Sequence, residues 1–281
     1  MEIKDLPDWA AFQNEVQALR IKYERPDYPL LFRGLPDSDF SLTTTLERAG
    51  CERMLWDDFY RIIHRIKDAV GTLTNVHWEI PPYSTEMGTE FRQDRSLFDQ
   101  VSPTHFSSAA LYPFLVYLRH YGFPSPLLDW SLSPNVAAFF AFRNLAVERP
   151  TKLPLKRSIY VYCEYPGMVK GGAVGEPAMR PIGRYVRGHP RHYRQQSDYT
   201  MCAAFDTEAG WRFHPHEPVF GGHLNRQDIL WKLNLPSSEG MKILALLNQY
   251  NLNAYSLFNN EETLMETLWF QEHVLRSISK E

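Results

Sequence analysis

The sequence predicts an α+β fold organised as a single mixed domain. Apolar residues at helical spacing dominate the first half of the chain, and short runs of β-branched and aromatic residues dominate the second half. Strands and helices do not alternate regularly, which argues against a parallel βαβ sheet. A chain of 281 residues with 44% hydrophobic and 14% aromatic residues can bury a large core, and no linker-like stretch divides it. We therefore expect a helical N-terminal half and short strands mainly in the C-terminal half.

The first half is expected to form four helices and one short strand. Apolar side chains recur every three or four residues over 8–20, 52–69, 107–120 and 135–148. Residues 30–33 are a short apolar strand that ends at Gly34, and a turn follows at 35–38. Residues 71–105 contain adjacent prolines and scattered polar groups, so we expect this segment to wind over the surface.

The second half is expected to contain more strands than helices. β-branched and aromatic residues predict strands over 158–163, 199–204, 228–235 and 254–258. Residues 166–190 hold six glycines and four prolines and are too broken for a long helix. Helical spacing returns over 242–249 and 261–272.

Composition excludes several classes of protein. A net charge of −3 gives no overall attraction to nucleic acid or to an anionic membrane. No apolar run approaches the roughly 18 residues of a membrane span, and Met1–Asp5 does not begin a secretory signal. Cys51, Cys163 and Cys202 lie far apart and form no CxxC pair, which favours a reducing compartment. We expect a cytoplasmic protein that does not bind membranes.

The common signatures for nucleotides and metals are absent. The chain contains no GxxxxGK(S/T) loop, no GxGxxG turn after a strand and no HExxH helix. His214 and His216 form a pair, but no second ligand pair stands at a matching spacing. We therefore expect no bound metal.

The segment 120–134 concentrates chemically useful side chains before an apolar helix. Ser133 and Pro134 have the residue types of a helix N-cap and of the first helical position. That structural role does not explain the other polar and aromatic residues beside the cap, and a helix N-terminus also attracts anions. The segment is either an ordinary helix connection or the lining of a ligand pocket. The residues expected to line such a pocket are His120, Tyr121, Asp129, Trp130 and Ser131.

Arg33 and Gly34 allow two interpretations. An arginine at the end of an apolar strand suits a phosphate or a carboxylate of a ligand, and the glycine beside it permits close approach of that ligand. Alternatively, Arg33 forms a partly buried ion pair within the protein, with Asp129 as a candidate partner.

A cationic stretch lies between residues 180 and 194. It is either a solvated loop or a binding surface for a polyanion such as a dinucleotide or nucleic acid, in which Tyr193, Tyr199 and Trp211 would stack on bases. Glycines and a proline argue against one continuous helix. Its arginines are Arg180, Arg184, Arg187, Arg191 and Arg194.

Three parts of the sequence resemble the FRG domain family. Leu31–Gly34 resembles the Phe/Tyr-Arg-Gly triplet that names the family. Residues 120–141 are similar to its central block, HYG…RLLDW(S/T)xSPxxAxxFA, and residues 194–199 resemble a later R…QxGxF element. The chain departs from the pattern at Ser125-Pro126, where the family often has Thr-Arg, and at Ser197 and Tyr199. The resemblance implies a family core from about 28 to 270 within one domain over 1–281, with a helical extension at 1–27.

The order of these motifs is in turn similar to that of ADP-ribosyltransferases. The resemblance implies an ADP-ribosyltransferase-like fold and an NAD-dependent transferase or NAD glycohydrolase, with NAD as substrate. A toxin or antiphage defence role would suit such an enzyme. The acceptor of ADP-ribose stays open between a protein, a nucleic acid and water. The alternative is a non-catalytic module that binds a nucleotide or nucleic acid.

The resemblance also implies roles for individual residues. Arg33 and the 180–194 arginines would hold the pyrophosphate, two serines would orient the ribose, and Tyr121 or Trp130 would stack on nicotinamide. Asp129 would orient His120 or Arg33. The expected catalytic residues are Arg33, His120, Tyr121, Asp129, Ser131, Ser133 and Gln195, and the expected NAD-binding residues are Arg33, Gly34, Trp130, Arg194 and Gln196. The sequence does not choose a ribose-facing carboxylate among Glu176, Glu208, Glu217, Glu261 and Glu262.

Overall fold

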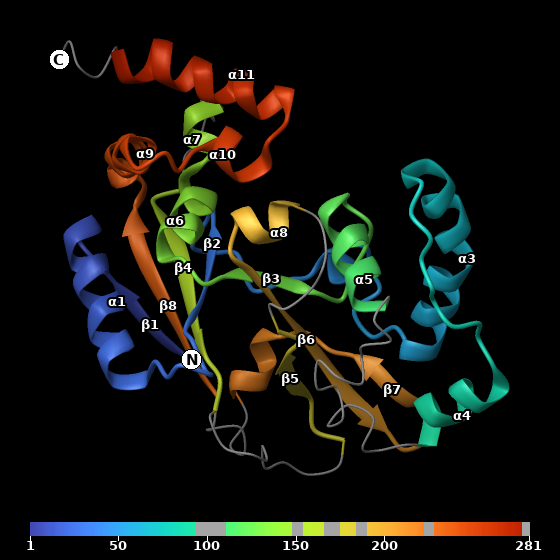
Figure 1. Ribbon diagram of the computed structural model, residues 1–281. Coiled ribbons are helices and arrows are strands. Elements are labelled where there is room, and N and C mark those ends of the chain that lie inside the picture. Colours follow the sequence, from blue (N-terminus) through green and yellow to red (C-terminus); the bar gives the residue numbers. More distant parts are fainter. Residues whose placement is uncertain (94–110, 148–153, 166–174, 184–189, 222–227, 277–281) are drawn as a thin grey trace.

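The computed structural model describes residues 1–93, 111–147, 154–165, 175–183, 190–221 and 228–276. In these residues a mixed eight-stranded sheet is flanked by helices, so the α+β class is confirmed (Figure 1). The strand order is β1-β8-β4-β2-β3-β6-β5, and β7 pairs with β6. The strands are β1 (Glu2–Asp5), β2 (Leu31–Leu35), β3 (Leu128–Ser131), β4 (Lys156–Cys163), β5 (Ala178–Pro181), β6 (Ser197–Asp206), β7 (Gly210–Phe213) and β8 (Ile229–Pro236).

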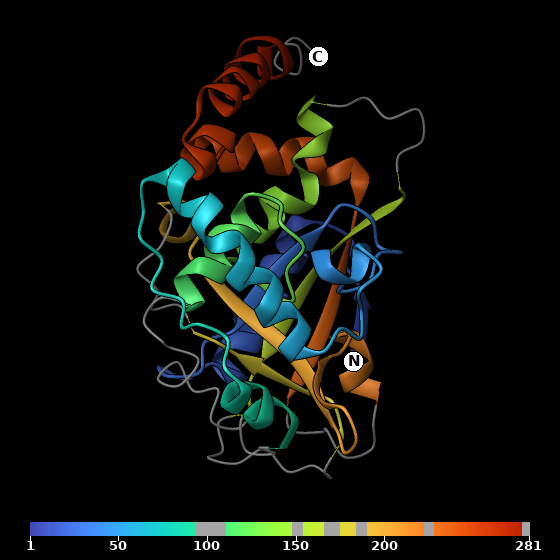
Figure 2. The same cartoon turned by 90° about the vertical axis from the view of Figure 1, so that its right-hand side faces the viewer.

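The described helices include those expected from apolar spacing, with bounds shifted by a few residues. They are α1 (Trp9–Tyr23), α2 (Thr45–Arg48), α3 (Trp56–Thr74), α4 (Thr85–Gln93), α5 (Leu111–His120), α6 (Pro134–Phe142), α7 (Asn144–Val147), α8 (Pro190–Arg194), α9 (Gly240–Gln249), α10 (Ala254–Phe258) and α11 (Glu261–Trp269). Residues Glu217–Gly221 and Ser237–Glu239 form 3₁₀ turns, and Phe270–Leu275 continues α11 as a π-helix. Residues 107–110 and 148 of the expected helices lie outside the described part. Helix α11 lies at the end of the molecule opposite α4 (Figures 1 and 2).

The sheet is tightly paired on both sides of β2 and β3 but not between them. Strand β2 pairs with β4 over five residues, and β3 pairs with β6 over four. Between β2 and β3 the register has one pair, Phe32 opposite Ser131. The two strands therefore part within the sheet, and backbone groups near this point are not covered by a neighbouring strand.

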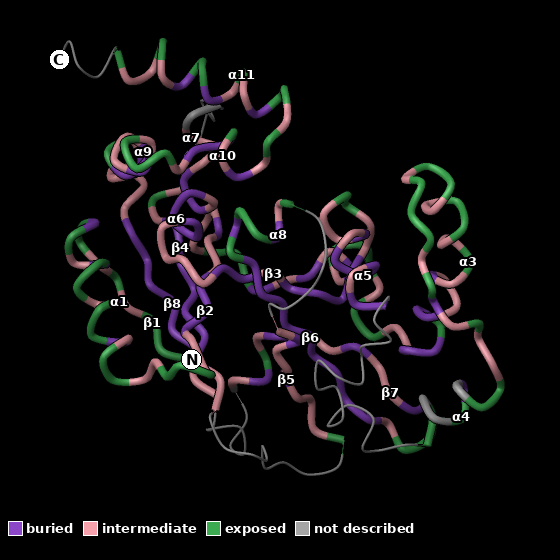
Figure 3. Tube along the Cα trace, viewed as in Figure 1, coloured by how far each residue is buried: buried purple, intermediate pink, exposed green. Residues whose placement is uncertain are grey.

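Three apolar clusters pack against the sheet. One joins β2, β4 and β8 to α1, α6 and α9, and a second joins β6 to α3 and α5. Because Phe32 is paired with Ser131 and Asp129 with Tyr199, these two clusters lie on the same face of the sheet, on either side of the β2–β3 gap. The third cluster contains Trp130 and covers the opposite face. The central strands are accordingly buried, and exposed residues lie on the outer sides of α1 and α3 (Figure 3).

The N-terminal segment is part of the sheet rather than only a helical extension. Strand β1 pairs in parallel with β8, and the amide of Leu6 donates to the carbonyl oxygen of Asn234. Trp9 and Phe12 of α1 are buried in the cluster that contains α6. Residues 1–27 therefore stabilise the same core as the segment that follows them.

The strand expected over 254–258 is wrong. Asn253 caps this segment: its side chain accepts from the amide of Ser256, whose hydroxyl accepts from the amide of Asn253, and the chain forms α10. A five-residue apolar run does not distinguish a buried strand from a helix turn, and the capping box decides for the helix. Residues 71–105 also differ from expectation, because α3 extends to Thr74 and α4 forms over Thr85–Gln93.

The expected separation of helices and strands along the chain is less sharp than the composition indicates. Strands β1 to β3 lie in the first half, and α9 to α11 lie in the last fifth. Strand β3 is four residues long and carries alternating polar side chains, so it had no apolar run by which to be recognised. Among the described helices, none has both the length and the hydropathy of a bilayer-crossing segment.

Candidate functional site

A pocket of about 660 Å³ lies where β2 and β3 part. Its volume is within the range of small-molecule sites, and apolar surface predominates with a few polar groups. Strand β2, strand β3, helix α6 and the loop after β2 all contribute to its walls. The lining residues used below are Arg33, Gly34, Asp39, Phe40, Thr43, Arg48, Asp129, Trp130, Ser131, Phe140 and Gln195.

Arg33 reaches from β2 across the gap to β3. Its Nη1 donates to the carbonyl oxygen of Asp129 at 2.6 Å and lies 3.5 Å from the Oδ2 atom of the same residue. The side chain is 13% exposed, and its buried Nε has no hydrogen-bond partner among the described residues. The expected ion pair with Asp129 is therefore confirmed, and because Arg33 also lines the pocket, its contact with a ligand anion stays a prediction.

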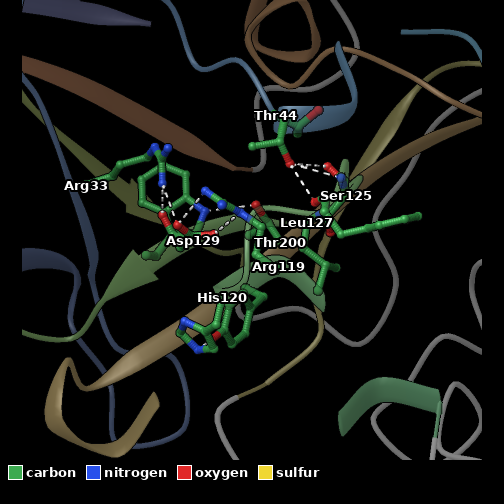
Figure 4. A network of polar contacts seen from close by, with 12 residues as sticks. Arg33, Thr44, Arg119, His120, Ser125, Leu127, Asp129 and Thr200 are labelled. Atoms are coloured by element: carbon green, nitrogen blue, oxygen red, sulfur yellow. Dashed lines mark hydrogen bonds and ion pairs between the residues drawn. The ribbon is translucent and has the colours of Figure 1, made fainter. Parts of the chain in front are cut away.

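Asp129 binds Arg119 more closely than it binds Arg33. The Nε of Arg119 lies 2.7 Å from Oδ1, and its Nη2 donates to Oδ2 at 2.8 Å (Figure 4). Burial alone would raise the pKa of Asp129, but the charges of Arg119 and Arg33 outweigh burial and hold the pKa below its usual value. Arg119 lies in the last turn of α5, next to His120, and the sequence patterns did not single it out.

Arg48 adds a second guanidinium to the pocket lining, close enough to Arg33 for its charge to act on that residue. It lines the pocket from the end of α2, and its Nη1 donates to the carbonyl oxygen of Thr43 at 3.0 Å. Burial lowers the pKa of Arg33, with Asp129 opposing that effect and the positive charges of Arg119 and Arg48 adding to it. The lining charges of Arg33 and Arg48 balance those of Asp39 and Asp129, and Arg119 behind Asp129 makes the surroundings of Arg33 net positive, which favours an anionic ligand.

The serines expected to orient a ribose are engaged in backbone contacts. The Oγ of Ser131 donates to the carbonyl oxygen of Gln195 at 2.8 Å and accepts from the amide of Ser133 at 3.0 Å. The Oγ of Ser133 accepts from the amide of Val136, as expected for the N-cap of α6. Ser131 lines the pocket, whereas Ser133 is not among its lining residues. Their main observed role is to join α6 to β3.

The motif over residues 194–199 contributes Gln195 and Ser197 to the pocket lining. Gln195 lines it and is nearly buried, with Nε2 donating to the carbonyl oxygen of Leu257 at 3.4 Å. Gln196 has a φ of 48° and is exposed, and Arg194 donates to the carbonyl oxygen of Ser256. Neither Gln196 nor Arg194 is among the lining residues, so their expected contact with NAD has no support from their position.

The aromatic residues named from the sequence do not offer free rings to the pocket. The indole of Trp130 is 2% exposed, and its Nε1 donates to Thr200 Oγ1 at 2.8 Å. Tyr121 is 58% exposed and lies against Tyr117, away from the lining residues. The rings that line the pocket with exposed surface belong to Phe40 and Phe140.

His120 stands behind the pocket rather than in it. Its Nε2 lies 3.0 Å from the hydroxyl of Tyr199, which burial makes a very weak acid by raising its pKa. Tyr199 is fully buried and therefore cannot serve as a stacking platform for a base. His120 is part of the α5–β6 packing beside Asp129 (Figure 4).

Gly34 lines the pocket, but its missing side chain has a packing role. A Cβ added to Gly34 would collide with the carbonyl oxygen of Ala137 and would stand 2.7 Å from the amide nitrogen of Ala141. Helix α6 therefore occupies the space that the sequence interpretation assigned to a ligand. Glycine is required here because two backbones touch.

The cationic stretch of residues 180–194 does not converge on the pocket. Arg180 lies in β5 and Arg191 in α8, where Arg191 packs over the rings of Tyr121 and Phe258. None of its described arginines is among the lining residues, and Arg184 and Arg187 lie outside the described part. Of the other expected stacking residues, Tyr193 is 87% exposed and Trp211 is half-buried.

The described lining residues include two carboxylates, Asp39 and Asp129. None of the five glutamates considered from the sequence is among them, and Glu217 instead accepts from the hydroxyl of Tyr160. Asp129 is engaged by two arginines, whereas Asp39 is exposed and forms no ion pair with a described residue. Asp39 lies in the loop after β2, in a turn without a distinctive motif.

The comparison with protein families bears on the same elements that form the pocket. Residues 28–149 match the model of the FRG domain family, which confirms the resemblance carried by Arg33-Gly34 and by the block over 120–141. The matched segment supplies β2, β3, α2, α5 and α6, and therefore most of the pocket walls. Comparison with curated proteins and with solved structures found no significant match.

Proposed function

Starting from the FRG domain over residues 28–149, we propose that this protein binds NAD in the β2–β3 pocket and cleaves its nicotinamide–ribose bond. The observation that carries the proposal is the convergence of Arg33, Arg48 and the end of β3 on one cavity between two halves of a sheet. Excess positive charge, exposed aromatic faces and polar groups on rigid strands are what a dinucleotide requires.

Binding would use groups that the described pocket offers. The guanidinium of Arg33 suits the pyrophosphate, because Asp129 satisfies only part of its hydrogen-bonding capacity. Phe40 and Phe140 suit the planar nicotinamide or adenine ring. Gln195 would accept from a ribose hydroxyl through its side-chain Oε1, since its Nε2 donates to Leu257 and its backbone carbonyl oxygen accepts from Ser131.

The chemistry requires little from the protein beyond electrostatics. The bond between the pyridinium nitrogen and ribose C1′ breaks, both electrons leave with neutral nicotinamide, and the ribose becomes oxocarbenium-like. The oxygen of water, or the nucleophile of an acceptor, then bonds to C1′ and releases its proton to solvent. A carboxylate near the ribose lowers the energy of the charged state, and Asp39 is the lining carboxylate without an ion-pair partner among the described residues.

A second candidate function is nucleotide binding without catalysis, which the contacts of Ser131 and Ser133 favour. The hydroxyls of Ser131 and Ser133 are used in backbone contacts, and no glutamate is among the described lining residues. A pocket of this kind would bind a nucleotide without turning it over. The protein would then be a nucleotide-binding module with the same ligand class.

The deciding experiment is incubation of the pure protein with NAD, followed by chromatography of nicotinamide and ADP-ribose. Release of nicotinamide that disappears in Arg33→Ala and persists in Arg65→Ala supports the enzyme, since Arg65 is exposed on α3 outside the pocket. Saturable binding of NAD without release supports the module. Absence of both would overturn the assignment of this pocket to NAD.

A further inference from the structure

We infer that Arg48 forms a second anion subsite at the pocket and selects ligands with two linked phosphates over ligands with one. The inference rests on the proposed nucleotide-binding role of the pocket and names a specificity residue within it. Arg48 lines the pocket together with Arg33, so a ligand that contacts one guanidinium also has access to the other.

The local structure holds Arg48 in place. Helix α2 begins with a capping box in which Thr44 accepts from the amide of Glu47 and the carboxylate of Glu47 accepts from the amide of Thr44. Leu46 is buried, and the hydroxyl of Thr45 accepts from the amide of Ser125. The Nη1 of Arg48 donates back to the carbonyl oxygen of Thr43. A one-turn helix tied down at these points gives the guanidinium a defined base.

The charge of Arg48 has no carboxylate partner among the described residues. Asp129 is shared by Arg119 and Arg33, and the Arg119 contact uses both of its oxygens. Arg48 is near enough to Arg33 for its charge to contribute to the lowered pKa of that residue. Two like charges held at one cavity repel each other, and a ligand with two negative groups relieves that repulsion.

Arg33 and Arg48 lie at different depths in the pocket, which suits a ligand with two linked phosphates. Arg33 is 13% exposed and lies within the sheet, whereas Arg48 is exposed at the end of α2. A ligand phosphate bonded to Arg33 would therefore be deep, and a second phosphate would extend toward Arg48 at the opening. The arginines of residues 180–194 that the structure describes do not line the pocket and cannot replace Arg48 in this role.

The test compares the binding of ADP and AMP by calorimetry, because these ligands share adenosine and differ by one phosphate. Wild-type protein should bind ADP more tightly than AMP. Arg48→Ala should weaken ADP binding about tenfold and change AMP binding less than about twofold, the loss expected for one charge-assisted contact. Arg48→Lys should lie between, and Arg33→Ala should weaken both ligands.

Arg65→Ala serves as the control, because it removes the same charge from an exposed position outside the pocket. Unfolding midpoints establish that each variant is folded. The subsite is overturned if Arg48→Ala weakens the binding of ADP and AMP equally, or weakens neither. It is also overturned if the wild type does not bind ADP. If Arg48→Ala loses the preference for ADP over AMP and the wild type does not cleave NAD, the subsite is supported and the enzyme is refuted. If the wild type cleaves NAD and Arg48→Ala keeps the preference for ADP, the enzyme is supported and the subsite is refuted.

Discussion

Arg119 binds Asp129 at both carboxylate oxygens, with Nε 2.7 Å from Oδ1 and Nη2 2.8 Å from Oδ2. Only the Nη2 contact is a hydrogen bond, and the Nε contact adds a close ion pair, so Arg119 supplies most of the positive charge beside the carboxylate. Arg33 is left at 3.5 Å from Oδ2, held mainly through the backbone carbonyl of Asp129. The pair thus fixes β3 to α5 and leaves the guanidinium of Arg33 with charge available to a ligand.

Arg33→Ala should reduce NAD turnover at least 100-fold while the protein stays folded. The loss follows from removing a positioned cation from the phosphate end of the ligand, an effect typically worth several factors of ten. The fold survives because Asp129 keeps its closer partner Arg119. Nicotinamide release and circular dichroism measure the two effects. Turnover above a tenth of the wild-type rate would show that Arg33 has another role.

Asp129→Asn should lower the free energy of unfolding by about 1–3 kcal/mol at pH 7, because two arginines lose their charge partner. The pKa of Asp129 is lowered in the folded state, so its contribution is complete above its ordinary value near 4 and is lost as pH falls through the lower folded pKa. Urea unfolding at pH 7 and pH 3 should therefore give a smaller difference at pH 3. A constant difference, or an equal effect of the control substitution at exposed Asp27, would contradict this.

Gly34→Ala should destabilise the protein by about 3 kcal/mol, at the upper end of overpacking costs, because the new methyl group meets the backbone of α6. Gly50→Ala is the contrasting variant, since Gly50 has a φ of 78° and open space around it. Its cost is conformational, about 1–2 kcal/mol. Denaturant unfolding of both variants compares the steric cost of a methyl group at position 34 with the cost of a positive φ at position 50. A cost for Gly34→Ala below that for Gly50→Ala would refute the close packing of β2 on α6.

His216 should make the protein sensitive to mild acid. Burial lowers its pKa to about 3, whereas the unfolded chain takes up the proton near 6.5. Stability is therefore complete above about pH 6.5 and falls by about 1.4 kcal/mol per pH unit down toward the folded pKa. His216→Phe should remove this part of the slope between pH 6 and pH 4, and His77→Gln, at an exposed position, should not. Equal slopes in wild type and His216→Phe would show that another group titrates.

Asp39→Asn should lower kcat for NAD cleavage about 100-fold and leave the dissociation constant of NAD nearly unchanged. An amide keeps the shape of the side chain but not the charge that would stabilise the ribose cation. Asp39 is exposed in a loop, so the fold should be unaffected. Single-turnover kinetics and calorimetry separate the two constants. Wild-type kcat in this variant would assign the carboxylate role elsewhere or favour the non-catalytic module.

Several local features were predictable because they depend on neighbours in the sequence. The N-cap at Ser133 and the helix stripes follow from short-range spacing, and the structure contains them. The family resemblance also placed Arg33 and Ser131 together before any coordinates, and both line one pocket. The failures were local as well, since the run over 254–258 fits a strand or a helix until Asn253 caps it.

The amino-acid order by itself determined the α+β class, most of the helices and the resemblance to the FRG domain family, which the family model matches over residues 28–149. Only the tertiary structure decided which side chains share the pocket. Asp39 enters it from the loop after β2 and Arg48 from the short helix α2, whereas His120 and Tyr121 are not among its described lining residues although they stand in the most distinctive block. The physical reason is that spacing governs contacts over one or two turns, whereas a cavity between β2 and β3 depends on how distant segments pack against each other.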